Sequence, residues 1–262
     1  MKDKLSKGKI VKIKDVKVGG GKPIIIAGPC SIESREHIVD EALSLKEIGV
    51  DILRGGAFKP RTSPFDFQGL GFEAVKYLKE ASEKSNLPIV TEVLSEDHVE
   101  KMKDYVDAFQ IGSRNMYNYA LLKKVGKTMK PIILKRGFSA TLREWEMAAK
   151  YIEAEGNENI IFCERGIRTF ETELRNTLDL AGAYTLKEKT LYPVIVDPSH
   201  GTGKRELIFP MVKAVLALGL DGVMIEVHPN PDEAMSDAAQ TIDYKTYERI
   251  ANYVGEFNEN RI

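Results

Sequence analysis

Cysteine is scarce in this sequence of 262 residues, which contains only Cys30 and Cys163. Two cysteines are too few for a disulfide framework, so a reducing cytoplasm is the expected location. The net charge is only −1, which provides no strong field for nucleic acid or an anionic membrane surface. No hydrophobic run approaches the roughly 20 residues needed to cross a bilayer, and the lysine-rich start lacks the apolar stretch of a signal peptide. We therefore expect a cytoplasmic protein that binds neither nucleic acid nor membranes.

What the sequence does contain is a repeated unit: a short β-branched run, a loop rich in Gly, Pro or charge, then an amphipathic helical pattern. The predicted strands cover residues 23–28, 51–55, 88–93, 108–112, 131–136, 159–164, 193–197 and 222–227. The predicted helices cover residues 33–48, 70–85, 95–104, 116–126, 141–154, 170–184, 205–218 and 243–257. Near-continuous apolar strands alternating with helices indicate a parallel sheet buried on both faces.

Eight such units in a chain of this length predict a single α/β domain, a closed (β/α)8 TIM barrel over residues 1–262. An open doubly wound sheet is the alternative. Residues 10–20 alternate apolar and charged side chains, which predicts a β-hairpin in an N-terminal extension (residues 1–20) that covers one end of the barrel. The sequence has no linker or low-complexity segment that would indicate a second domain.

Polar side chains collect where the predicted strands end. The end segments are 27–31, 54–62, 91–92, 112–115, 135–136, 163–165, 197–200 and 226–228. Because TIM barrels build their active sites at the carboxyl ends of their strands, the concentration of polar side chains at these ends predicts one shared site.

The segment 54–65 is the most informative of these ends. It carries three cations together with two glycines and two prolines. The prolines provide the rigidity that phosphate or carboxylate recognition needs, although a solvated basic loop is the simpler alternative. Six cations would converge on the mouth: Arg54, Lys59, Arg61, Arg114, Lys135 and Arg165. The acids Glu92, Asp197, Glu226 and Asp237 would compensate only part of this charge. The remainder favours two phosphorylated small molecules as ligands.

Four of the collected residues are candidate metal ligands: Cys30, His200, Glu226 and Asp237. One sulfur, one nitrogen and two carboxylates suit Mn, Fe, Co or Zn better than Mg or Ca. Each has an alternative role: Cys30 as a small buried hydrophobe, His200 as a helix cap or phosphate ligand, Asp237 as a turn residue. His228 is a competing ligand that ranks lower because it stands beyond Glu226 and before Pro229.

Other motifs carry less information. The run 201–204, Gly-Thr-Gly-Lys, lacks the full spacing of a nucleotide-binding P-loop. Cys30 has no identifiable His–Asp partner for a thiol nucleophile, while Cys163 and the lone Trp145 are expected to be core residues.

Seven segments together resemble the 3-deoxy-D-arabino-heptulosonate 7-phosphate (DAHP) synthases. They are residues 27–33, 56–63, 110–115, 134–137, 163–166, 197–203 and 225–228. The sequence is most similar to the compact type I branch, which also includes the 3-deoxy-D-manno-octulosonate 8-phosphate synthases. The resemblance spans nearly the whole chain.

The resemblance implies condensation of phosphoenolpyruvate with D-erythrose 4-phosphate and water, releasing phosphate, as the first step of the shikimate pathway. It implies one divalent metal per subunit on Cys30, His200, Glu226 and Asp237. The implied phosphoenolpyruvate residues are Arg54, Lys59, Glu92, Ser113, Arg114, Lys135 and Arg165. The implied erythrose 4-phosphate residues are Lys59, Pro60, Arg61 and Thr62. The implied catalytic residues are Lys59, His200 and Asp237, with Lys59 the first candidate proton donor and Asp237 or a metal-bound water the alternatives.

Three other functions stay open at this point. An octulosonate synthase would use arabinose 5-phosphate, but Pro60-Arg61-Thr62 differs from the loop usual in those enzymes, and Cys30 indicates metal dependence. A non-catalytic phosphosugar-binding barrel and a metal-dependent aldolase or lyase are the others. The family's feedback-regulated members carry an extra domain, which this chain is expected to lack, so we expect little inhibition by Phe or Tyr. The family also implies a homotetramer or homodimer.

Overall fold

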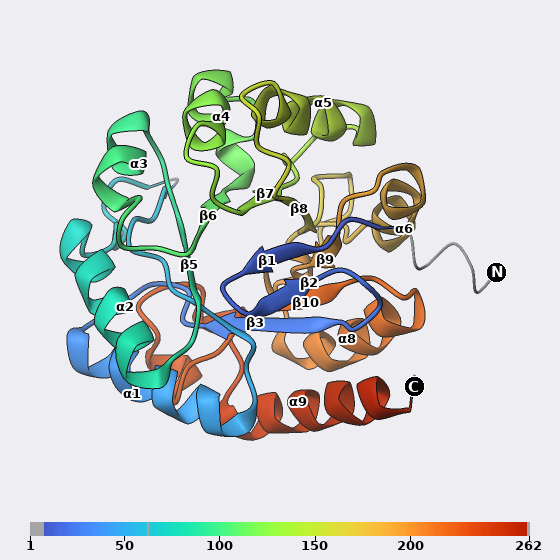
Figure 1. The fold of residues 1–262 in the computed structure, drawn as a ribbon. Helices are drawn as coiled ribbons and strands as arrows, with labels where there is room; N and C mark the ends of the chain where they lie inside the picture. The colour runs from blue at the N-terminus through green and yellow to red at the C-terminus, as the bar shows by residue number, and fades with distance from the viewer. Residues whose placement is uncertain (1–7, 62, 261–262) are drawn as a thin grey trace.

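The computed structural model describes residues 8–61 and 63–260, which form a closed barrel of eight parallel strands surrounded by helices (Figure 1). In chain order the strands are β3 (Ile24–Gly28), β4 (Ile52–Arg54), β5 (Ile89–Glu92), β6 (Ala108–Ile111), β7 (Ile132–Lys135), β8 (Ile160–Glu164), β9 (Val194–Val196) and β10 (Gly222–Glu226). Each strand pairs with the next in the sequence, and β10 pairs with β3 to close the ring. The predicted TIM barrel is confirmed, and the open sheet is excluded.

The predicted hairpin is confirmed as β1 (Val11–Ile13) paired antiparallel with β2 (Val16–Val18). Val11, Ile13 and Val18 are buried in one cluster with the interior side chains at the amino ends of the strands, including Ile24 and Ile52. The hairpin therefore closes the amino end of the barrel, where Figure 1 shows it lying across the strands. The carboxyl ends of the strands are left for the site.

The helices form the outer layer. They are α1 (Arg35–Ile48), α2 (Phe72–Ser85), α3 (Glu96–Met102), α4 (Tyr119–Gly126), α5 (Leu142–Glu153), α6 (Leu180–Lys189), α7 (Pro198–Thr202), α8 (Ile208–Ala217) and α9 (Tyr244–Glu259). The main apolar core lies between this layer and the strands. Trp145 belongs to it, fully buried with its Nε1 donating to the Leu134 carbonyl at 3.1 Å, and Cys163 is buried inside the barrel, so both predicted core residues are confirmed. Within the described ranges, no helix is long and apolar enough to span a membrane.

The predicted helix over residues 170–184 is wrong in its first half. Residues 165–179 form a loop in which Ile167 and Thr177 make an isolated antiparallel bridge. Helix α6 begins only after Asp179, whose side chain accepts from the Gly182 N–H. The side chains Phe170, Leu174 and Leu178 are spaced like one face of a helix, but Phe170 is 97% exposed. The short helix α7 was not predicted; Asp197 caps it and Pro198 occupies its first turn.

Gly28 is the last residue of β3. Because it has no side chain, β3 can lie close to β4 at the ends of these strands, where the site begins. The φ of Gly28 is +148°, and a Cβ there would lie 2.1 Å from the Arg54 carbonyl oxygen, so Gly28→Ala is expected to cost about 3 kcal/mol of unfolding free energy from strain and overpacking. Gly49, at the end of α1, has φ +111° but open space around its Cβ position. Gly49→Ala should therefore cost only about 1 kcal/mol. Urea unfolding of both variants measures the difference, and equal losses would contradict the close-approach explanation.

Candidate active site

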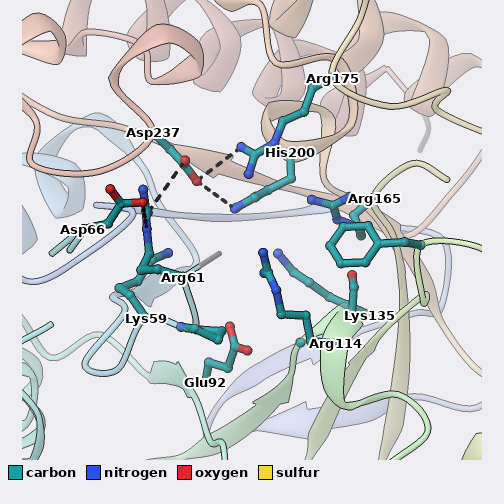
Figure 2. A pocket seen from close by; sticks show the side chains of 14 residues that line it. Lys59, Arg61, Asp66, Glu92, Arg114, Lys135, Arg165, Arg175, His200 and Asp237 are labelled. Atoms are coloured by element: carbon teal, nitrogen blue, oxygen red, sulfur yellow. Dashed lines mark ion pairs between the residues drawn. The ribbon is translucent and has the colours of Figure 1, made fainter. Parts of the chain in front are cut away.

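The site is a pocket at the carboxyl ends of the strands, opposite the hairpin. Figure 2 shows Arg114, Lys135 and Arg165 on one side of it and Asp237 with Arg61 on the other. The predicted site residues that line it are Lys59, Pro60, Arg61, Glu92, Ser113, Arg114, Lys135, Arg165, His200 and Asp237. Thr62, the remaining residue of the predicted sugar-phosphate segment, lies outside the described residues. The structure thus gathers side chains that are more than 170 positions apart in the sequence.

The four candidate metal ligands lie together at the pocket, which His200 and Asp237 line. One ligand atom from each of Cys30, His200, Glu226 and Asp237 lies within 4.8 Å of the other three. His200 Nε2 is 3.2 Å from Glu226 Oε1 and 3.5 Å from Asp237 Oδ2. The Cys30 thiol donates to Asp237 Oδ2 at 3.3 Å. His228, the lower-ranked candidate, faces Glu33 instead, and its Nδ1 accepts from the Asn230 N–H.

Asp197 fixes the orientation of His200. Its Oδ1 caps α7 by accepting from the His200 N–H at 2.9 Å, and its Oδ2 is 2.7 Å from His200 Nδ1. Because the carboxylate can only accept, Nδ1 carries a proton, and Nε2, which faces Glu226 and Asp237, is the nitrogen placed to bind a cation. A carboxylate behind the imidazole is the usual arrangement for a metal-binding histidine, so the donor set fits a divalent cation.

Buried cations hold the acidic members of the site ionised. Burial raises the pKa of Asp197, but the charges of His200 and Lys135, whose Nζ is 2.5 Å from Asp197 Oδ2, lower it well below its usual range. Burial likewise raises the pKa of Glu226, yet His200 and Arg54 produce a net decrease. Arg54 Nη1 donates to Glu226 Oε1 at 2.9 Å, beneath the pocket. This ion pair holds the carboxylate of Glu226, a candidate ligand, in position.

Lys59 connects the candidate metal ligands to the open pocket. Its Nζ donates to Cys30 Sγ at 2.9 Å and to the Cys30 carbonyl at 3.3 Å. Burial lowers the pKa of Lys59, but its interactions with Cys30, Glu226 and Asp237 outweigh burial and raise it. Lys59 is therefore a cation that stands beside the ligand set.

On the opposite side of the pocket, two buried hydrogen-bond donors have no acceptor among the described residues, so this side is suited to bind an anion. Arg165 is 3% exposed, and its Nη1 is buried with no hydrogen-bond partner among the residues that the structure describes. The Ser113 Oγ is buried and unpartnered in the same sense. Burial lowers the pKa of the Arg165 guanidinium. A buried donor without an acceptor is costly, so these two groups, together with Arg114 and Lys135, predict an anionic ligand here.

Arg61 lies between Asp66 and Asp237, which is one of the candidate metal ligands. Its Nε is 3.5 Å from Asp66 Oδ2 and its Nη1 is 4.0 Å from Asp237 Oδ1. Neither is a close hydrogen bond, so the guanidinium is available to a second anion at this end of the pocket.

Three residues near the site were missed by the sequence predictions. Phe138 lines the pocket, and the guanidinium carbons of Arg165 and Arg114 lie 4.8 Å and 5.4 Å from its ring centre. The sequence feature that could have identified Phe138 is its position just beyond the carboxyl end of β7. Arg175 lies in the loop wrongly predicted as helix, and Gln240, which contacts Glu226, had no motif to identify it.

Comparisons with known proteins agree with this geometry. The DAHP synthetase I family matches residues 6–261. The phospho-2-dehydro-3-deoxyheptonate aldolase of Thermotoga maritima is 47% identical over 92% of this chain and 71% of its own length. The crystal structure of the Thermotoga maritima enzyme (DAHP synthase) superposes with a TM-score of 0.93 and 45% identity, covering 97% of this chain and 74% of that one.

Two further comparisons set the range of the similarity. A truncated form of the 3-deoxy-D-arabino-heptulosonate 7-phosphate synthase from Thermotoga maritima gives a TM-score of 0.90 at 40% identity, covering 99% of this chain and 95% of that one. The 2-dehydro-3-deoxyphosphooctonate aldolase of Fusobacterium nucleatum is 31% identical over 95% of both chains. With a match over nearly its whole length, this chain belongs to the DAHP synthetase I family.

Proposed function

We propose that this chain is a metal-dependent DAHP synthase, which condenses phosphoenolpyruvate with D-erythrose 4-phosphate and water to give DAHP and phosphate. The observation that carries the proposal is the juxtaposition, in one pocket, of a mixed S/N/O ligand set and an unsatisfied anion-binding side. The relative at 47% identity carries the corresponding aldolase name. The octulosonate aldolase relative stands further away, at 31%.

Phosphoenolpyruvate would bind on the side formed by Ser113, Arg114, Lys135 and Arg165. The buried Arg165 Nη1 and Ser113 Oγ lack acceptors, and phosphate or carboxylate oxygens would supply them. The Phe138 ring makes a cation–π contact with the guanidinium of Arg114 and another with that of Arg165. Glu92, held by the Gln110 amide at 3.1 Å, would face the same ligand from the wall of the pocket.

D-Erythrose 4-phosphate would bind at the other end, with its phosphate on Arg61 and its aldehyde toward the metal ligands. Pro60 limits the backbone conformations of this segment, so the position of the phosphate is fixed relative to Lys59. This orientation brings the aldehyde carbon to the phosphoenolpyruvate side. Thr62 would assist Arg61, as the family resemblance implies.

The cation is one of Mn, Fe, Co or Zn, which this donor set favours. Cys30, His200, Glu226 and Asp237 would hold it, and when bound it would supply a Lewis acid for the aldehyde oxygen.

In the reaction, C3 of phosphoenolpyruvate attacks the aldehyde carbon and forms the new C–C bond. The protonated Lys59 amine would give a proton to the aldehyde oxygen as its negative charge develops. Water then adds to C2 of the former phosphoenolpyruvate and gives up one proton, which restores the Lys59 ammonium. The C2–O bond to phosphate breaks as the new C2 hydroxyl loses its proton to the departing phosphate and becomes the product carbonyl. Arg165 and Lys135 would hold the phosphate in place until that bond breaks.

The test is turnover of phosphoenolpyruvate with erythrose 4-phosphate and, separately, arabinose 5-phosphate, each with and without a chelator. We expect kcat/KM to be about 10- to 200-fold higher with the tetrose, the discrimination typical of a one-carbon difference in a fitted pocket. Turnover should stop when metal is removed. A better rate with the pentose would establish the octulosonate reaction instead, and absence of phosphate release with either sugar would favour a binding protein.

A further inference from the structure

Gln240 is a buried amide that joins two charged groups beside the candidate metal ligands. Its Nε2 donates to Glu226 Oε2 at 2.6 Å, and its Oε1 accepts from Arg175 Nη1 at 2.6 Å. The residue is 3% exposed. Because a carboxylate only accepts and a guanidinium only donates, this amide has one orientation that satisfies both neighbours. The orientation of the Glu226 carboxylate therefore depends on the position of Arg175, through Gln240.

Glu226 presents its two oxygens to different neighbours. Oε2 is bound by Gln240, whereas Oε1 lies 3.2 Å from His200 Nε2 and 2.9 Å from Arg54 Nη1. With Oε2 held, rotation of the carboxylate is restricted, and Oε1 remains directed toward the ligand set. Gln240 thus selects which oxygen faces a cation.

Arg175 contacts the rest of the set. Its Nη1 is 3.3 Å from Asp237 Oδ2, and Figure 2 shows its guanidinium beside His200 and Asp237. Its backbone N–H donates to the Thr202 carbonyl, and the neighbouring Asn176 side chain donates to the His200 carbonyl at 2.9 Å. The loop carrying Arg175 therefore contacts three of the four ligands, directly or through one residue.

We infer that Gln240 and Arg175 are positioning residues for the metal site: they hold the Glu226 and Asp237 carboxylates in the orientation that binds a divalent cation. The inference rests on the proposed function, since it takes these carboxylates as ligands. Residues that orient metal ligands contribute about 10- to 100-fold to affinity in other metalloproteins. A purely structural role would leave metal affinity unchanged once the protein is folded.

Gln240→Met tests the inference, because methionine has a similar length and cannot make either hydrogen bond. We expect the Kd for Mn²⁺, measured by calorimetry on metal-free protein without substrates, to rise about 10- to 100-fold. Saturating Mn²⁺ should restore kcat. Gln110→Met is the matched control: Gln110 is also a buried amide that donates to a carboxylate, but that carboxylate is Glu92, which is not a candidate ligand. Its Kd for Mn²⁺ should equal that of the wild type.

Arg175→Met provides a second variant at a more exposed position, and it carries the test if Gln240→Met does not fold. We expect a similar rise in Kd. The double variant should lose less than the product of the two single losses, because Arg175 acts on Glu226 through Gln240. Wild-type affinity in both folded single variants would overturn the inference alone. A wild-type protein that binds no Mn²⁺ would overturn the proposed metal site, and the inference with it.

Discussion

Cys30→Ala is expected to lower kcat/KM about 10³-fold and to remove tight metal binding, because the variant loses the only sulfur among the four candidate ligands. Cys30 is 3% exposed, and its Sγ lies among Lys59, Asp237 and the other ligands. The remaining imidazole and two carboxylates form a harder and incomplete set. Metal content after dialysis and turnover at added Mn²⁺ measure the two losses.

Cys163→Ala is the matched control for this result. Cys163 is the other cysteine, fully buried inside the barrel and not among the candidate ligands. This variant should keep its metal and its chelator-sensitive turnover. Chelator-sensitive turnover that persists in Cys30→Ala would show that Cys30 is a buried hydrophobe and not a ligand.

The Cys30 thiol also has a titration signature. Burial, assisted by Glu226, raises its pKa to about 12 in the metal-free protein, so the thiol is protonated at neutral pH. Binding as a thiolate must displace that proton, and metal affinity should therefore strengthen as pH rises toward the thiol pKa. Calorimetry of Mn²⁺ binding to the wild type in buffers of different ionisation enthalpy should show that a proton is released.

The sequence was sufficient for the barrel because its signals were local and repeated. Each strand is a short β-branched run whose end is marked by polar residues, and both β3 and β10 begin and end within about two residues of the prediction. The loop before α6 was different. Phe170, Leu174 and Leu178 have helical spacing, but the Ile167–Thr177 bridge and the Asp179 cap decide the structure. Those contacts depend on the tertiary arrangement, which periodicity does not report.

The same limit explains which parts of the site were predicted. Residues at strand ends, such as Glu92, Lys135 and Glu226, share one rim by the topology of the barrel, so their proximity followed from the fold. Gln240, which contacts Glu226, lies after the last strand in a segment without a recognisable sequence pattern. Arg175 lies in the segment that was predicted to be a helix. The sequence also did not show whether a given Arg or Lys binds a substrate or pairs with an acid of the protein. Arg54, which pairs with Glu226, is an example.

Lys59→Met is expected to lower kcat about 10²- to 10⁴-fold, the range for loss of a general acid. Methionine keeps most of the side-chain volume but removes the ammonium that lies 2.9 Å from Cys30 Sγ and faces the pocket. If Lys59 protonates the aldehyde oxygen, the loss falls mainly on kcat. Steady-state kinetics with each substrate varied at saturating metal separate kcat from KM.

Lys59→Arg distinguishes a proton donor from a simple positive charge. Arginine keeps the charge, but its guanidinium gives up a proton far less readily and is bulkier, so a donor role predicts that kcat stays low while KM for phosphoenolpyruvate recovers in part. Near wild-type kcat in Lys59→Met, with only KM raised, would assign Lys59 to substrate binding and leave Asp237 or a metal-bound water as the proton source.

Circular dichroism of both variants is needed, because removing a cation from among Cys30, Glu226 and Asp237 leaves buried negative charge uncompensated. Added Mn²⁺ would compensate that charge, so a variant that is stabilised by metal yet remains slow supports the donor role.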